Sequence, residues 1–136
     1  MFQHETNIRV TYADTDQMGY VYYGNYARFY EIARAESIRS LGFTYSQLEK
    51  SGVMMPVLEN HSKYISPARY DELLTIRTII AEKPAVKIKF NYEIENEEKK
   101  IIHTGETLLA FVDIKTGRPK RMPENLEAVL GQFYDK

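Results

Sequence analysis

Hydrophobic and polar residues alternate with a period of two through most of the second half of the chain. The clearest stretch places Val86, Ile88, Phe90, Tyr92 and Ile94 between lysine, asparagine and glutamate residues. Alternation of this kind is typical of a strand with one buried face. We predict four strands here, over residues 53–66, 72–81, 86–94 and 101–114. Pro56 interrupts the first of them, and Gly105 marks a bulge or a close approach in the last.

The segment from about Tyr23 to Leu41 has the spacing of a helix instead. Its buried stripe is predicted to contain Tyr26, Phe29, Tyr30, Ala33, Ser37 and Leu41, which recur every three or four positions. On another face, Arg28, Glu31 and Arg34 are three residues apart and are expected to pair weakly. Gly42 is a natural end for this helix.

Three shorter elements complete the pattern. Alternation over residues 8–12 predicts a first strand. Residues 45–51 predict a short second helix, with Thr44 or Ser46 at its cap. Pro123 opens a short C-terminal helix.

The order of these elements predicts an α+β fold. One strand and one long helix precede four strands, whose short polar connections exclude parallel crossovers. The sheet is therefore expected to have five antiparallel strands, with the helix covering one face. The chain fits a single domain over residues 1–136. Pairing with a second copy would protect the edges of the sheet.

The composition removes several classes of function. The chain has 18 basic and 19 acidic residues, so it lacks the basic excess typical of nucleic-acid binding. It has no cysteine, which excludes disulfides, thiolate nucleophiles and cysteine-based zinc sites. No apolar run approaches the ~18 residues of a membrane span. The first residues lack the apolar core of a signal peptide, so we expect a cytoplasmic protein.

Candidate chemistry is concentrated between Tyr12 and Tyr26. Asp14 and Asp16 lie in a loop, followed by Gly19, an aromatic run and the predicted helix. Free N–H groups at a helix N-terminus can hold a developing oxyanion, and a nearby carboxylate can activate water or attack a carbonyl. Thioester hydrolysis needs these two parts, without metal or cofactor. Aspartate is also typical of turns and caps, so the residues alone leave a purely structural role open.

This segment resembles the signature of hotdog-fold thioesterases of the 4-hydroxybenzoyl-CoA thioesterase-like family. The matching residues are Tyr12, Asp14, Asp16, Gly19, Val21-Tyr22-Tyr23, Asn25-Tyr26 and Glu31-Ile32-Ala33-Arg34. Two further matches follow in the family's order, Ser66–Leu73 and Thr116–Pro119 with Arg121-Met122-Pro123. The resemblance covers nearly the whole chain. It implies a hotdog fold, in which a five-stranded antiparallel sheet wraps around one long central helix.

The resemblance also implies an acyl-CoA thioesterase and roles for two residues. Asp16 matches the catalytic aspartate of the family, which acts as nucleophile or as general base. The backbone N–H of Tyr23 matches the group that polarises the thioester carbonyl. The family's dimer places the acyl site between two subunits, so a homodimer or homotetramer is expected, with acyl-CoA as substrate.

One branch of the family carries histidine where this chain has Tyr23. The three histidines of this chain, His4, His61 and His103, lie elsewhere and are expected to be structural or surface residues. Asp14 is expected to hydrogen-bond within the loop and to shape the turn rather than to react.

Two groups of residues are candidates for binding. The residues Tyr20, Tyr22, Gly24 and Asn25 are assigned to the substrate, although the tyrosines would also suit a dimer contact. The anionic CoA is assigned to Lys83, Lys120 and Arg121, with Arg69 and Lys63 as weaker candidates. Each of these cations would also be an ordinary solvated surface charge.

Three rival functions remain at this point. A thioesterase acting on acyl carrier protein would use a basic docking surface, which residues 115–121 would also supply. A non-catalytic module that binds acyl ligands would have no need of Asp16. A hotdog dehydratase is disfavoured because the predicted central helix contains no histidine.

Overall fold

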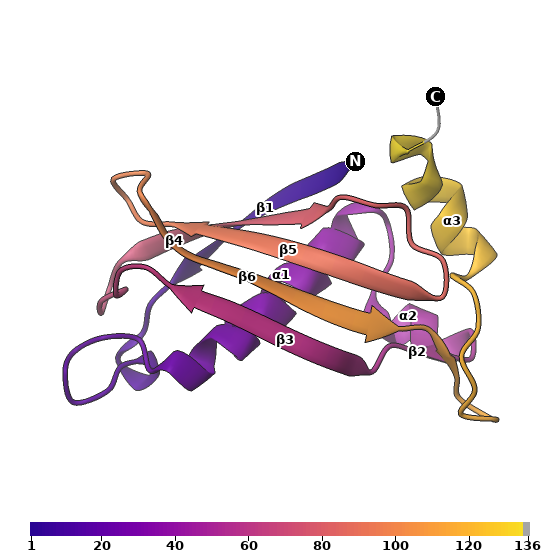
Figure 1. The fold of residues 1–136 in the computed structure, drawn as a ribbon, viewed down its shortest axis with the longest axis horizontal. Helices are drawn as coiled ribbons and strands as arrows, with labels where there is room; N and C mark the ends of the chain where they lie inside the picture. Colours follow the sequence, from indigo (N-terminus) through magenta and orange to yellow (C-terminus); the bar gives the residue numbers. More distant parts are fainter. Residues whose placement is uncertain (135–136) are drawn as a thin grey trace.

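A five-stranded antiparallel sheet curves across one long helix in the computed structural model, which describes residues 1–134 (Figure 1). The strand order across the sheet is β1 (Phe2–Arg9), β4 (Leu73–Ile80), β5 (Lys87–Glu95), β6 (Ile101–Ala110) and β3 (Val57–Tyr64). The helix, α1, spans Tyr26–Ser40 and lies against one face of the sheet. The predicted α+β class, the antiparallel sheet and its five strands are confirmed.

The core lies between α1 and the facing side of the sheet. The predicted helical stripe is buried from Tyr26 to Ser37, and Leu41 is partly buried just beyond the end of α1. The sheet contributes the alternating residues Leu74, Ile76, Ile80, Ile88, Phe90 and Ile94, all of them buried. Removing this apolar area from water is the main source of stability for the fold.

Two boundaries near the N-terminus differ from the prediction. The first strand is Phe2–Arg9 rather than residues 8–12, and Tyr12–Asp14 forms a short 3-10 turn. Pairing with β4 holds this strand, whose sequence is mostly polar, so hydrophobic alternation alone does not reveal it. The helix begins at Tyr26 instead of Tyr23, because Tyr23–Asn25 forms a separate 3-10 turn.

The predicted strand over residues 101–114 is also divided. β6 ends at Ala110, and β7 (Val112–Asp113) pairs with β2 (Val53–Met54) in a second, two-stranded sheet. At the break, the Phe111 N–H donates to the carbonyl of Val86, 3.0 Å away. The predicted interruption at Pro56 is confirmed, because this residue lies between the end of β2 and the start of β3. The predicted close approach at Gly105 is also confirmed, because a Cβ on Gly105 would meet the Tyr30 hydroxyl.

Both predicted shorter helices are present. α2 spans Tyr45–Lys50, and the Thr44 side chain accepts from the Gln47 N–H at its cap, 3.1 Å away. α3 spans Glu124–Leu130 and lies at the same end of the sheet as α2 (Figure 1).

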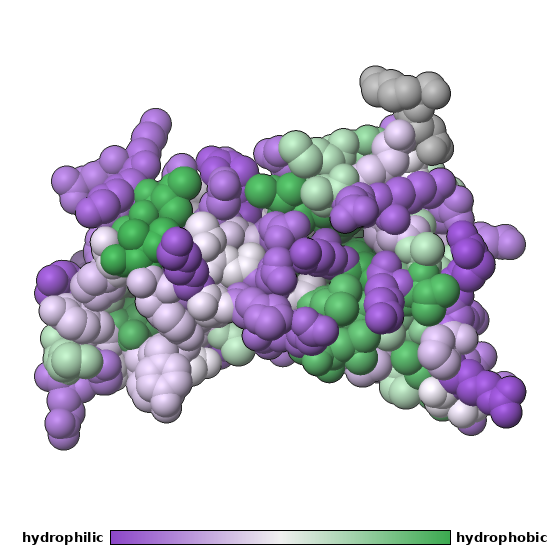
Figure 2. Space-filling model, in the orientation of Figure 1, coloured by the Kyte–Doolittle hydropathy of each residue, from purple (hydrophilic) through white to green (hydrophobic). Residues whose placement is uncertain are grey.

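The outer surfaces of the sheet set limits on how it can associate. Every residue of the edge strand β3 is exposed, and no strand among residues 1–134 pairs with its outer side. The sheet face turned away from α1 is crossed by polar residues, with hydrophobic residues gathered toward both ends (Figure 2). Among the described residues, no helix is long and apolar enough to span a bilayer.

Candidate active site

Asp16 opens a tight turn in the loop before α1. Its N–H donates to the carbonyl of Tyr20 at 2.8 Å, and its own carbonyl accepts from Gly19 at 3.0 Å. Gly19 has a φ of +80°, a conformation that other residues rarely adopt. The Oδ1 atom of Asp16 accepts from the N–H groups of Met18 and Tyr20 at 2.9 and 3.3 Å. The turn thus fixes the carboxylate through Oδ1, and Oδ2 has no partner among residues 1–134.

Asp14 has a different environment from Asp16. It is 4% exposed and accepts from both the backbone N–H and the hydroxyl of Thr11, at 2.8 and 2.9 Å. Its other oxygen forms an ion pair with Arg28. Burial opposes ionisation, but the Thr11 hydrogen bonds and the Arg28 charge outweigh it, so the pKa of Asp14 is lowered. These contacts agree with the structural role expected for this residue.

Asp16 lies in an open groove of about 380 Å³ at the N-terminal end of α1. The residues that line the groove with it are Met18, Tyr20, Val21, Tyr23, Tyr26, Tyr64, Ile65, Ser66 and Pro67. Tyr23 begins the 3-10 turn that leads into α1, and its N–H has no acceptor within the described part of the chain. Asp16 and Tyr23 therefore line one groove, whose other lining residues are mostly aromatic or aliphatic.

The far wall of the groove comes from the segment after β3. Tyr20 forms a β-bridge with Arg69, and the Val21 N–H donates to the carbonyl of Ala68 at 2.8 Å. The Arg69 guanidinium lies 4.8 Å from the centre of the Tyr20 ring. Sequence reasoning used this Pro-Ala-Arg segment only to fix the register of the resemblance.

His103 lies directly behind the groove. Its ring stacks on Tyr26 at 4.0 Å between centroids, its Nε2 shares a hydrogen bond with the Tyr30 hydroxyl, and it is fully buried. Burial lowers its pKa to about 4, so the ring is neutral at pH 7. It does not line the groove, whereas His61 is exposed and pairs with Glu59 at 2.9 Å. Both placements agree with the expectation of structural or surface histidines.

A comparison with protein families identifies the superfamily to which this chain belongs. The model of the thioesterase-like superfamily matches residues 10–130, which include the Asp16 turn, α1 and the sheet strands that follow it. The chain belongs to the thioesterase-like superfamily.

Relatives of known name agree with this membership. The acyl-CoA thioester hydrolase YbgC of Escherichia coli is 34% identical over 125 residues, covering 92% of this chain and 93% of YbgC. A chloroplastic acyl-acyl carrier protein thioesterase of Arabidopsis thaliana is 26% identical over 133 residues, covering 96% of this chain and 68% of that protein.

A solved structure gives the same result for the fold. The DHNA-CoA thioesterase from Staphylococcus aureus superposes with a TM-score of 0.85 at 33% identity, covering 98% of this chain and 87% of that one. The hotdog fold is therefore confirmed for this member of the thioesterase-like superfamily.

Only one of the four predicted substrate residues lines the groove of this superfamily member. Tyr20 does so, whereas Asn25 donates from its side chain to the carbonyl of Asp14 at 2.8 Å and holds the loop. Tyr22 is exposed and packs against the Tyr23 ring, with 4.6 Å between centroids. Gly24 leaves room for Tyr22, because a Cβ there would lie 2.7 Å from its ring.

The three residues assigned to CoA lie away from the Asp16 groove in the structure. Lys83 and Arg121 line a separate small cavity of about 180 Å³, where Lys83 pairs with Glu127 at 3.3 Å. Lys120 directly precedes Arg121 in the segment that leads to α3, at the end of the sheet opposite the Asp16 loop (Figure 1). Arg69, a weaker candidate from the sequence, lies beside the groove through its contact with Tyr20.

No group of three or more histidine, cysteine, aspartate or glutamate side chains within residues 1–134 is arranged to hold a metal ion.

Proposed function

We propose that this protein hydrolyses an acyl-CoA thioester to the free acid and CoA, with Asp16 as the reacting carboxylate. The observation that supports the proposal is that Asp16 and Tyr23 line the same groove, while Oδ2 of Asp16 and the backbone N–H of Tyr23 have no partner among residues 1–134. Membership of the thioesterase-like superfamily and the name of the YbgC relative support the reaction class.

The two groups have complementary tasks in thioester hydrolysis. The Tyr23 N–H donates to the thioester oxygen, where negative charge develops in the transition state. The Asp16 carboxylate either takes a proton from a water that attacks the carbonyl carbon, or attacks that carbon itself. In both routes the C–S bond breaks and CoA leaves as a thiolate. In the second route, water then hydrolyses the acyl-aspartyl anhydride and restores the carboxylate.

We further propose that the active form is a homodimer, or a tetramer built from such dimers. Strand β3 is an exposed edge of eight residues, and an unpaired edge of this length is a template for pairing. Two copies of β3 pairing antiparallel would form a closed, two-fold interface. Tyr64, at the end of β3, already lines the groove, so this interface would border the site. Light scattering at micromolar concentration measures the state, and a monomer would contradict the proposal.

The test of the function is release of free thiol from short, long and aromatic acyl-CoAs. We expect the wild-type protein to release CoA from at least one class, and Asp16→Asn to lose turnover by roughly 10²–10⁴-fold. The substitution Asp71→Asn, in the turn before β4 and outside the groove, is the matched control and should leave turnover unchanged. Absence of thiol release from every acyl-CoA would contradict the proposal.

A thioesterase acting on acyl carrier protein is the second candidate, and the Arabidopsis relative is the observation that favours it. The two substrates share the acyl group and the phosphopantetheine arm, so the chemistry at Asp16 would be the same. Presenting one acyl group on CoA and on acyl carrier protein separates them. A kcat/KM at least tenfold higher on the carrier protein would favour this second candidate.

A further inference from the structure

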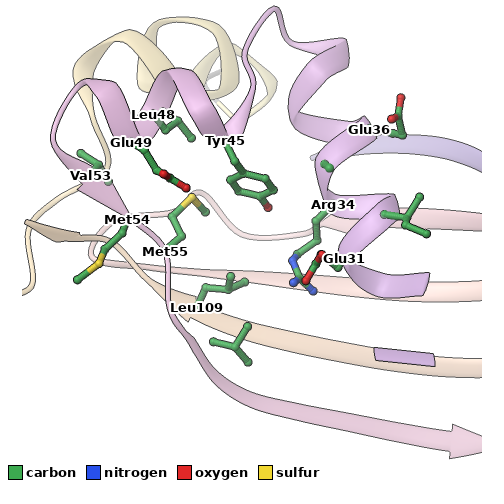
Figure 3. A pocket seen from close by; sticks show the side chains of 13 residues that line it. Glu31, Arg34, Glu36, Tyr45, Leu48, Glu49, Val53, Met54, Met55 and Leu109 are labelled. Carbon is green, nitrogen blue, oxygen red and sulfur yellow. The ribbon is translucent and has the colours of Figure 1, made fainter. Parts of the chain in front are cut away.

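A second cavity, of about 470 Å³, lies at the other end of α1 (Figure 3). It is bordered by α1, α2, β2, the start of β3 and the end of β6. Most of its wall is apolar and is formed by Ile32, Ala35, Leu48, Val53, Met54, Met55, Val57 and Leu109. A cavity of this size with a mostly apolar wall is typical of a site that takes an apolar ligand.

The charged groups of this cavity are mainly acidic. Its three carboxylates belong to Glu31, Glu36 and Glu49. Arg34 also lines the cavity, and its expected place on a polar face of the helix is wrong, because it is 6% exposed. Its guanidinium donates to the hydroxyls of Tyr92 and Thr107, at 3.0 and 3.3 Å, and the Tyr45 side chain extends toward it (Figure 3). Hydroxyls of the protein thus surround this cation, whereas Glu31 and Glu49 are exposed where the cavity meets solvent.

The second cavity and the Asp16 groove border opposite ends of the exposed edge strand β3. Val57 begins β3 and lines the second cavity, whereas Tyr64 ends β3 and lines the groove together with Ile65. These three side chains and that of Leu58 are 45% to 54% exposed. Antiparallel pairing with a second copy would place the start of one β3 beside the end of the other and cover both apolar pairs.

Charge complementarity favours one register for this pairing. The two-fold axis of an antiparallel pair passes at a residue that faces its own copy, because facing side chains lie on the same side of the sheet. With the axis at His61, Glu59 of each copy faces the partner's Lys63. Lys63 has no ion pair within residues 1–134, and Glu59 pairs there with His61 at 2.9 Å. Opposite charges that face one another stabilise paired strands and help to fix their register.

The two neighbouring registers fit less well. With the axis at Ser62, Lys63 would face the partner's His61, and no acidic residue would face Lys63. With the axis at Asn60, Lys63 would face the partner's Val57, and the pairing would cross the irregularity that follows Val57 in β3. The register about His61 uses the part of β3 that pairs regularly with β6.

We propose that the acyl chain of a substrate in the Asp16 groove of one copy extends into the second cavity of the partner, which selects long, uncharged acyl chains. The inference rests on the proposed acyl-CoA hydrolysis and dimer. The register about His61 brings Ile65 of the groove beside the partner's Val57, so that the groove and the partner's cavity lie side by side.

Two physical effects give the cavity this selectivity. Each methylene that leaves water for the apolar wall favours binding about fourfold, so longer chains are preferred. A chain that ends in a carboxylate would have to lose water from a charged group and approach the three glutamates of the cavity. The same cavity therefore favours a long apolar chain and disfavours a dicarboxylic chain of equal length.

The first experiment measures kcat/KM for butanoyl-CoA, decanoyl-CoA and decanedioyl-CoA. We expect decanoyl-CoA to exceed each of the others at least about tenfold. Ala35→Leu adds apolar volume on the α1 wall of the second cavity. It should lower kcat/KM for decanoyl-CoA at least about tenfold and leave butanoyl-CoA within about twofold. Ala128→Leu, the same substitution at an exposed position of α3 outside both cavities, is the matched control and should change neither.

Mixed dimers test the contribution of the partner copy. Glu59→Lys and Lys63→Glu each place like charges opposite one another in their own dimers, whereas mixing the two variants restores both pairs. Native mass spectrometry should therefore show more mixed dimer than random pairing gives. Asp16→Asn in one chain of the mixed dimer leaves a single working site. Ala35→Leu should lower decanoyl-CoA turnover when it is in the Asp16→Asn chain, and should leave it unchanged when it is in the other chain.

Several results would overturn the inference. Random pairing of the charge variants would contradict the register, and a loss of turnover only when Ala35→Leu is in the chain with the working Asp16 would place the acyl chain in its own subunit. A dimer that Ala35→Leu dissociates would show that the partner's side chains occupy the cavity. Equal kcat/KM of wild type for decanoyl-CoA and decanedioyl-CoA would overturn the selectivity, and this comparison decides if Ala35→Leu does not fold. Failure of the proposed hydrolysis would appear separately, as no thiol release from wild type, and the same ligands would then be ranked by dissociation constants from isothermal titration.

Discussion

The groove around Asp16 and the buried cluster around His103 share one wall but differ in nearly every physical property. Tyr26 presents its ring to both, lining the groove and stacking on His103. The groove side is open to solvent, and its carboxylate is held by backbone N–H groups. The cluster side is dry, and its polar atoms are matched mostly to one another, as Tyr30 is to Ser62 at 2.6 Å.

The difference shows that residue type alone is a poor guide to which side chain lines the groove. Histidine is the commonest general base, yet His103 is neutral, buried and out of reach of the groove. Asp16 is an ordinary turn residue by type, but it lines the groove, and its turn engages only one of its two carboxylate oxygens. We expect the two regions to be as separate in their effects on stability and activity as they are in space.

The largest expected effect on stability belongs to His103. Its folded pKa is about 4, below the ordinary 6.5, so the unfolded chain binds a proton in this range that the folded protein does not. The free energy of unfolding should therefore rise between pH 4 and pH 6.5, by up to about 3 kcal/mol from this residue. Urea denaturation at several pH values measures the slope. His103→Gln should flatten it, whereas exposed His61→Gln should not.

A smaller loss is expected at Gly105, where the cluster meets the sheet. A Cβ there would meet the Tyr30 hydroxyl and lie 3.0 Å from the carbonyl oxygen of His61. Gly105→Ala should lower the free energy of unfolding by roughly 1–3 kcal/mol through overpacking. Gly131→Ala is the matched control, since its Cβ would find its nearest neighbour at 3.5 Å. Equal free energies of unfolding for the two variants would contradict this prediction, because they would show that the atoms around Gly105 move aside at little cost.

Substitution of Asp14 should give the smallest change. We expect it in the free energy of unfolding rather than in turnover. Asp14→Asn removes the ion pair with Arg28 and weakens the contacts with Thr11, which should cost about 1–2 kcal/mol at pH 7. Because the folded pKa of Asp14 is lowered from 3.8, this contribution is present above pH 3.8 and is lost as the pH falls through the folded value. The variant and wild type should converge in stability at low pH, and a constant difference would contradict this.

Much of the fold could be predicted from the sequence, because a strand or helix with one buried face has hydrophobic residues at regular spacing. Residues 86–94 alternate strictly and form the central strand β5. The first strand, Phe2–Arg9, has no such spacing, because it is an edge strand with mostly polar residues. Its pairing with β4 holds it in place. The division of residues 101–114 was also missed, because the apolar run over residues 108–112 continues across the break and only the strand partners differ.

The candidate site was predictable only where it is local in sequence. Asp16 and Tyr23 are seven residues apart, and the structure places both in one groove. The groove's other wall, from Tyr64 to Pro67, lies more than forty residues later in the sequence. No sequence pattern predicted that it contacts the Asp16 loop. The buried position of Arg34 was missed for a similar reason, because its hydroxyl partners Tyr92 and Thr107 lie on distant strands.

The most direct test of the account compares thiol release by Asp16→Asn and His103→Gln at pH 7.5, on an acyl-CoA that the wild type hydrolyses. Circular dichroism first establishes that both variants are folded. We predict that Asp16→Asn loses roughly 10²–10⁴-fold in kcat, the scale of a positioned acid–base group, while His103→Gln stays within about threefold of wild type. A folded His103→Gln variant as inactive as Asp16→Asn, or an Asp16→Asn variant with wild-type kcat, would contradict the account.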